Sequence, residues 1–184
     1  MTVRIPLWLG SVCLLLSACT LACTLACTKD PWYSPPPQRQ PVLVEDRPLA
    51  PIVGMGDPSA DLYIVRDIGD TVEGGLWRWT YERPELRFRL QSTANLKLFM
   101  DFQCSGLTLE KTGPVTISFF VNSRLLGSTL CDKAGVYHFE KAVPSSWLDA
   151  AGPTSVAAQA DKVWTAPSDG KKLGFILIKA GFIS

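Results

Sequence analysis

The chain has 184 residues, a formal net charge of +1 and one histidine, His138. The near-zero charge argues against a nucleic-acid-binding protein, which needs a basic surface to displace counterions from phosphates. A single histidine excludes metal sites built from several histidines and leaves little basis for a histidine-driven catalytic triad. The length allows one domain of ordinary size with room for a short additional segment.

Residues 1–18 have the pattern of an export signal. Arg4 supplies the positive start, Leu7 to Leu16 form an apolar run, and two small residues, Ser17 and Ala18, follow. An apolar run of this length is too short to span a bilayer but fits the central region of a signal peptide. The sequence therefore predicts that the chain is exported and that this segment is removed.

The end of this signal, Leu16-Ser17-Ala18-Cys19, resembles the lipobox of bacterial lipoproteins. The resemblance implies cleavage before Cys19 and lipidation of its thiol, which would anchor the protein to a bacterial membrane in the cell envelope, on the extracytoplasmic side. The segment repeats, so Cys23 and Cys27 are alternative lipidation sites, although their preceding Thr-Leu-Ala is a poorer match. An ordinary cleaved signal with a chance cysteine is the simpler alternative.

The next segment, residues 19–60, is rich in proline. Eight prolines fall between Thr28 and Pro58, and three of them are consecutive at positions 35–37. Proline removes backbone donors and disfavours helix, so we expect an extended, semi-rigid tether between the anchor and a folded domain. A proline-rich ligand or wall-contacting segment is the second possibility.

Residues 61–184 alternate between apolar and polar side chains with a period of two. Leu86, Phe88 and Leu90 alternate with charged or polar residues, and the segments 96–104 and 115–121 repeat the pattern. Such alternation gives strands with one face in a core and the other toward water. Turn-forming residues separate several further short strands, so an all-β fold, an antiparallel sandwich or barrel, is predicted.

Two local predictions accompany this fold. Asn122-Ser123 is expected to form a hairpin turn, because Asn tolerates positive φ. The single helical candidate is Ser145–Ala151, where Ser145 follows Pro144 and could cap one turn.

The order of turns and strands over residues 70–184, including Gly135-Val136-Tyr137-His138-Phe139 and Asp169-Gly170-Lys171-Lys172-Leu173, resembles jelly-roll, galactose-binding-like modules. Such β-sandwich modules often accompany carbohydrate-active proteins in bacteria. The resemblance implies a fold, and it carries over no binding residues.

Cys104 and Cys131 are the two cysteines of the predicted domain. Export favours a disulfide between them, because disulfides persist outside the cytoplasm. Two buried thiols that pack as small apolar residues are the alternative.

Aromatic residues are the candidate ligand-binding side chains. Trp77, Trp79 and Tyr81 share one face of a predicted strand, where they serve either as core packing or as a platform for sugar rings. Trp147 and Trp164 lie in turn-like contexts, where packing explains a large aromatic less well. We therefore expect any ligand site at a loop end of the sandwich.

Charged residues give weaker indications. Asp67, Asp70 and Glu73 lie in a glycine-rich turn, which is either a solvated turn or an oxygen-ligand site for calcium. His138 is expected on the outward side of its strand without a partner.

These features predict a lipid-anchored envelope protein whose non-catalytic sandwich binds a protein or envelope partner. A surface-displayed carbohydrate-binding module is the alternative. No pattern of residues points to catalysis, a cofactor or a metal, so neither an enzyme nor a nucleic-acid partner is expected.

Overall fold

The computed structural model describes residues 50–184. Residues 1–49, which include the predicted lipidation site Cys19, lie outside this range. The strands and helices, in chain order, are β1 (Ile52–Gly54), a 3-10 turn (Ala60–Leu62), β2 (Ile64–Ile68), β3 (Arg78–Arg89), β4 (Lys97–Cys104), α2 (Gly106–Thr112), β5 (Val115–Val121), β6 (Arg124–Cys131), β7 (Gly135–Ala142), a 3-10 turn (Ser145–Trp147), β8 (Pro153–Ala160), β9 (Trp164–Thr165), β10 (Lys172–Leu173) and β11 (Ile176–Ile183). No helix among these residues is long and apolar enough to cross a membrane.

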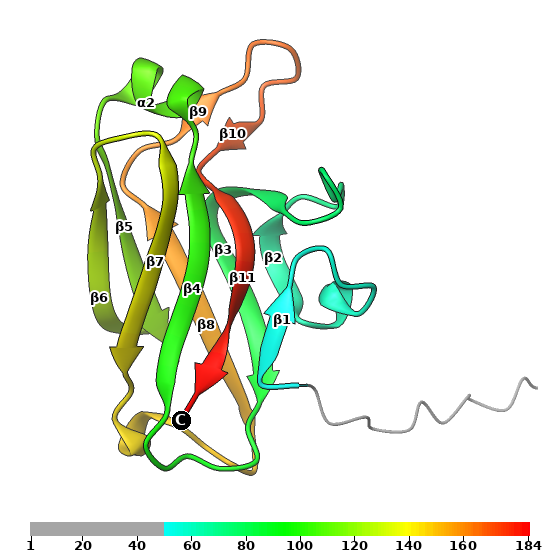
Figure 1. Ribbon diagram of the computed structural model, residues 1–184, viewed down its shortest axis with the longest axis vertical. Coiled ribbons are helices and arrows are strands. Elements are labelled where there is room, and N and C mark those ends of the chain that lie inside the picture. Colours follow the sequence, from blue (N-terminus) through cyan, green and yellow to red (C-terminus); the bar gives the residue numbers. More distant parts are fainter. Residues whose placement is uncertain (1–49) are drawn as a thin grey trace, which may run out of the picture. The chain divides into compact units, whose positions relative to one another are not determined.

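The strands form two antiparallel layers (Figure 1). We call β1-β11-β4-β7 the front sheet and β2-β3-β8-β5-β6 the back sheet. The two layers are joined through β3, whose first residues pair with β11 at Trp79↔Ile176 and whose last residues pair with β8 at Glu85↔Ala157. The predicted all-β antiparallel sandwich is confirmed.

The core lies between the two sheets and is dominated by phenylalanine. Phe88 of the back sheet packs edge-on against Phe182 of the front sheet with ring centroids 5.5 Å apart. Phe102 and Phe119 make a second contact between the sheets at 5.6 Å. All four rings are almost completely buried, so each removes a large apolar surface from water.

Cys104 and Cys131, at the ends of β4 and β6, form a disulfide that links the two sheets. These strand ends lie at the same end of the sandwich as the β9–β10 hairpin (Figure 1). The turn predicted at Asn122-Ser123 is also confirmed, because both residues adopt positive φ, 46° and 65°, between β5 and β6.

Three details differ from the sequence-based prediction. The sandwich begins before residue 61, since β1 pairs with β11 and buries Val53. The segment Ser145–Ala151 forms only a short 3-10 turn. The seven-residue helix α2 was not predicted, because its glycine and two threonines have low helix propensity and seven residues are too few for a helical period to be evident.

Candidate functional site

In the first half of β3, the polar side chains point into the protein and the aromatic side chains point outward, the reverse of what their hydrophobicity favours. Arg78 and Thr80 point into the protein and are buried, whereas Trp77, Trp79 and Tyr81 remain half-exposed. The three aromatic residues do share one face, as predicted, but none belongs to the buried core. Core packing therefore does not account for them.

Nearby backbone groups and one carboxylate satisfy the hydrogen bonding of Arg78 and Thr80. Arg78 donates from Nε to the Met55 carbonyl at 3.1 Å and pairs with the Asp61 carboxylate at 2.7 Å. The Thr80 hydroxyl donates to the Phe175 carbonyl at 2.8 Å and accepts from the Phe175 N–H at 3.1 Å. Since a buried polar group without partners is costly, these bonds are what allow polar side chains to take the inward positions.

The end of β2 and the residue that follows it are hydrogen-bonded to the backbone of β3. Asp67 adopts a left-handed conformation with φ of 58°, and its carboxylate accepts the backbone N–H of Arg83 at 3.3 Å. The Gly69 N–H donates to the Trp79 carbonyl at 2.8 Å. A Cβ at Gly69 would lie 3.7 Å from the Tyr81 hydroxyl, so the end of β2 and Tyr81 are near neighbours.

The β9–β10 hairpin approaches β3 from the other side. A Cβ at Gly174, just after the hairpin, would lie within overlap distance of the Tyr81 carbonyl, so only glycine permits this approach. Asp169 orders the hairpin tip, because its carboxylate accepts the Lys171 N–H at 3.1 Å and pairs with the Lys171 ammonium at 3.4 Å.

These segments enclose an open pocket of about 320 Å³. Its lining consists of Asp67, Tyr81, Glu82, Lys171 and Lys172. The lining thus combines one aromatic ring, two carboxylates and two ammonium groups, so it offers hydrogen-bond donors and acceptors without net charge. Such a lining suits a neutral ligand that carries many hydroxyl groups and an apolar ring face.

The predicted aromatic residues are divided between the two ends of the sandwich. Trp79 lies two residues before the pocket residue Tyr81 on β3, and Trp164 lies on β9, whose partner strand β10 begins at the pocket residue Lys172. Trp77 packs edge-on against Trp79 at 6.2 Å. Trp147 lies at the opposite end, where it packs against the core and the Arg124 guanidinium sits 5.7 Å from its ring.

Three pocket residues were not anticipated from the sequence: Glu82, Lys171 and Lys172. Glu82 is exposed although it has the parity of the buried residues Thr80, Leu86 and Phe88, so the alternation does not predict its place at the surface. The two lysines follow Asp169-Gly170, a turn signal that marks a loop tip but not the strand against which the tip folds. Of the carboxylates weighed for calcium, Asp67 lines the pocket.

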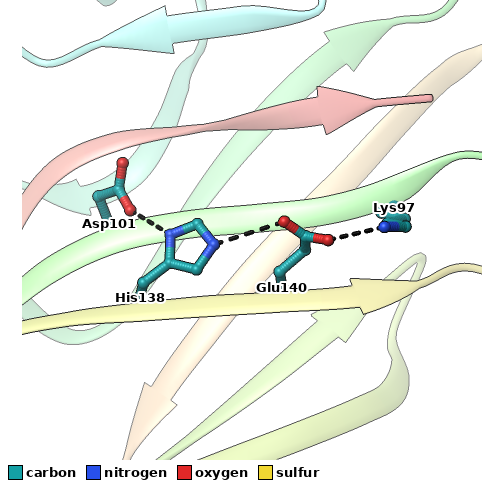
Figure 2. Close-up of polar contacts among 4 residues, drawn as sticks. All are labelled: Lys97, Asp101, His138 and Glu140. Atoms are coloured by element: carbon teal, nitrogen blue, oxygen red, sulfur yellow. Dashed lines mark hydrogen bonds and ion pairs between the residues drawn. The ribbon is translucent and has the colours of Figure 1, made fainter.

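A second polar cluster lies on the outer face of the front sheet (Figure 2). His138 binds the Asp101 carboxylate at 2.6 Å and lies 3.5 Å from Glu140, which in turn pairs with Lys97 at 2.9 Å. His138 points outward as predicted, but the prediction that it has no partner is wrong. Its partners lie on the adjacent strand β4 and two residues along β7, and the pairing register of these strands was not evident from the sequence.

This cluster has electrostatic consequences but no evident chemistry. The hydrogen bond with Asp101 raises the pKa of His138, and the hydrogen bond from Lys97 lowers the pKa of Glu140. Among the described residues, His138 is paired with two carboxylates and with no serine, threonine or cysteine side chain. Within residues 50–184, no group of three or more His, Cys, Asp or Glu side chains is placed to hold a metal ion.

No protein-family model matches the chain, and no curated protein matches it in sequence. A family 35 carbohydrate-binding module from Clostridium thermocellum is similar in structure, with a TM-score of 0.43 and 12% identity over 68% of this chain and 94% of that one.

A second similar structure is the CBM36-1 domain of a multidomain xylanase from the hindgut metagenome of Trinervitermes trinervoides. Its TM-score is 0.40, with 10% identity over 71% of this chain and 94% of that one. Both similarities are too low to transfer a site or a ligand. The assignment of function therefore depends on the pocket itself.

Proposed function

We propose that the domain is a non-catalytic carbohydrate-binding module whose site is the pocket beside Tyr81. The observation that carries this proposal is the lining of that pocket, which places an aromatic ring among two carboxylates and two ammonium groups. Sugars present hydroxyl groups that both donate and accept, together with apolar C–H faces that stack on aromatic rings. The lining therefore favours a carbohydrate-binding module over a domain that binds a protein partner.

Each lining residue has a distinct role in this proposal. Tyr81 stacks against the face of a sugar ring, since its side chain is half-exposed at the pocket. Asp67 and Glu82 accept hydrogen bonds from sugar hydroxyls, whereas Lys171 and Lys172 donate to hydroxyl and ring oxygens. The site is open and small, so we expect weak binding of one or two sugar units that gains strength from multiple contacts on a polymer.

Calorimetric titration of the full-length protein with cello-, xylo- and galacto-oligosaccharides and with peptidoglycan disaccharides tests this function. At least one neutral saccharide should bind, and Tyr81→Ala should weaken its binding roughly three- to tenfold, whereas Tyr81→Phe keeps the ring and the affinity. Glu82→Gln should also weaken binding, with Glu110→Gln on α2 as the matched control. Absence of binding across the panel, or equal binding by Tyr81→Ala, would refute the proposal.

We further propose that the domain is displayed on a bacterial membrane through lipid on Cys19. Cleavage before Cys19 removes Arg4 and leaves 17 basic and 17 acidic residues, so attachment would depend on acyl chains rather than on a basic patch. Cys19→Ala is expected to release the protein from alkali-washed membranes. Retention of this variant in the membrane fraction would instead point to Cys23, Cys27 or another anchor.

A further inference from the structure

The outer face of the back sheet carries a row of arginines along β3. Arg83, Arg87 and Arg89 alternate with the inward residues Leu86 and Phe88, so their side chains project to the same outer side. Arg87 and Arg89 are exposed, and Arg83 is half-buried. Residues two apart on a strand are about 7 Å apart, so the row presents positive charge along an extended line.

The one acidic residue within this row is already engaged. Glu85 accepts a hydrogen bond from Arg66 at 2.9 Å and another from the Ser155 hydroxyl at 2.6 Å. Within residues 50–184, Arg83, Arg87 and Arg89 form no ion pair. The described domain contains 14 basic and 14 acidic residues, so this face has a local excess of positive charge in a domain without net charge.

Arg83 is held in position while one of its donors remains unused. Its guanidinium carbon lies 5.2 Å from the centre of the Phe120 ring on β5. Its Nε is buried and has no hydrogen-bond partner among the described residues. The Nε atom itself is closed to solvent, so a molecule bound on this face would contact the terminal N–H groups of the guanidinium instead.

The strands next to this row add uncharged polar groups to the same face. Ser155 of β8 lies directly opposite Arg87, and Gln159 of β8 lies opposite Ser118 of β5. Ser128 of β6 continues the row from Ser118. Hydroxyl and amide groups therefore extend across the sheet beside the arginines, where they can bond a hydroxylated ligand.

We propose that this face binds a linear polyanionic polysaccharide, with Arg83, Arg87 and Arg89 contacting its acidic groups. The guanidinium fork matches carboxylate and other oxyanion groups with two parallel hydrogen bonds. The serine and glutamine side chains contact sugar hydroxyls beside the charged line. This surface shares no residue with the pocket at Tyr81, so it is independent of the function proposed for that pocket.

Binding of polygalacturonate and dextran sulfate to the full-length protein, measured at several salt concentrations, tests this proposal. The double variant Arg87→Gln/Arg89→Gln should bind roughly five- to tenfold more weakly at low salt. Its salt dependence should also be shallower, by about one unit of slope per arginine removed. The matched control is Lys111→Gln/Lys133→Gln, which removes two exposed charges on other surfaces and should bind as wild type does.

Three outcomes would overturn the proposal. The first is no binding of either polymer by the wild-type protein at low salt. The second is an equal loss of binding in the arginine and lysine double variants, which would indicate non-specific attraction. The third is arginine-dependent binding to phosphatidylglycerol vesicles without binding to the polymers, which would make the face a membrane contact. Tyr81→Ala should leave polymer binding unchanged, so failure here is distinguishable from failure at the pocket.

Discussion

The two halves of strand β3 differ in the kind of side chain that they bury. In the second half, Leu86 and Phe88 fill the core and the outward positions are charged, as the alternating pattern predicts. In the first half, Thr80 is completely buried while Trp79 and Tyr81 face outward. The half that obeys the pattern supports the sandwich, and the half that reverses it forms one wall of the pocket.

The reversal is possible because the backbone around the first half supplies hydrogen bonds. Thr80 exchanges two hydrogen bonds with the Phe175 backbone, and Arg78 is bound by the Met55 carbonyl and Asp61. Once the inward positions are satisfied in this way, the aromatic side chains are free to lie at the surface. An outward aromatic ring beside polar groups is then available to a ligand.

Two buried threonines allow this difference to be measured. Thr80 and Thr154 are both completely buried, but the Thr154 hydroxyl, opposite Phe88, has no hydrogen-bond partner within residues 50–184. Thr80→Val should lower the free energy of unfolding by about 1–3 kcal/mol, because it leaves the buried Phe175 N–H without the hydroxyl that accepts it. The Phe175 carbonyl keeps the Thr80 backbone N–H as a donor. Thr154→Val should be neutral or stabilising, since it removes an unsatisfied buried hydroxyl.

Chemical denaturation of both variants provides the measurement, and each serves as the isosteric control for the other. An equal loss of stability in the two variants would contradict the claim that hydrogen bonding holds the reversed half in place. A Thr80→Val variant with the same free energy of unfolding as wild type would contradict it as well.

Exposed polar contacts should contribute less than these buried ones, and the cluster around His138 tests this. The pKa of His138 is raised in the folded protein, mainly by its hydrogen bond with Asp101. The stabilisation is therefore fully present below the ordinary histidine pKa of about 6.5 and is lost as pH rises through the higher folded value. The side chain is 54% exposed, so solvent screening limits the effect to about 0.5 kcal/mol.

Unfolding free energies of wild type and His138→Gln, compared from pH 5 to pH 9, give the readout. The unfolding free energy of wild type should exceed that of His138→Gln by less as pH rises, and by less in high salt. An advantage that is constant with pH, or that grows as pH rises, would show that His138 is not stabilised in its charged form.

The sandwich fold could be predicted from the sequence because apolar and polar side chains alternate regularly along the second half of β3 and its neighbouring strands. The positions of Leu86 and Phe88, the Asn122-Ser123 turn and the pairing of Cys104 with Cys131 follow from local patterns and from the expectation of export. The strand positions and the turn depend on short-range preferences, which a single sequence contains. The disulfide follows from the oxidising compartment that export implies and from the presence of two cysteines in the domain.

The pocket could be predicted only in part, because it depends on contacts between distant segments. The aromatic face of Trp77, Trp79 and Tyr81 was evident, but its outward direction depends on Phe175, 95 residues away from Thr80. Lys171 and Lys172 meet Tyr81 only because Gly174 allows the hairpin to fold against β3. No local pattern contains that information.

The central claim is that the reversed half of β3 is the half that binds a neutral saccharide. Its most direct test is amide chemical-shift mapping of the protein titrated with the neutral saccharide that binds most tightly. The account predicts shifts that cluster at Asp67, Tyr81 and Glu82 and at Lys171-Lys172, with little change at residues 86–90. Shifts that instead cluster around Trp147, at the opposite end of the sandwich, would contradict it.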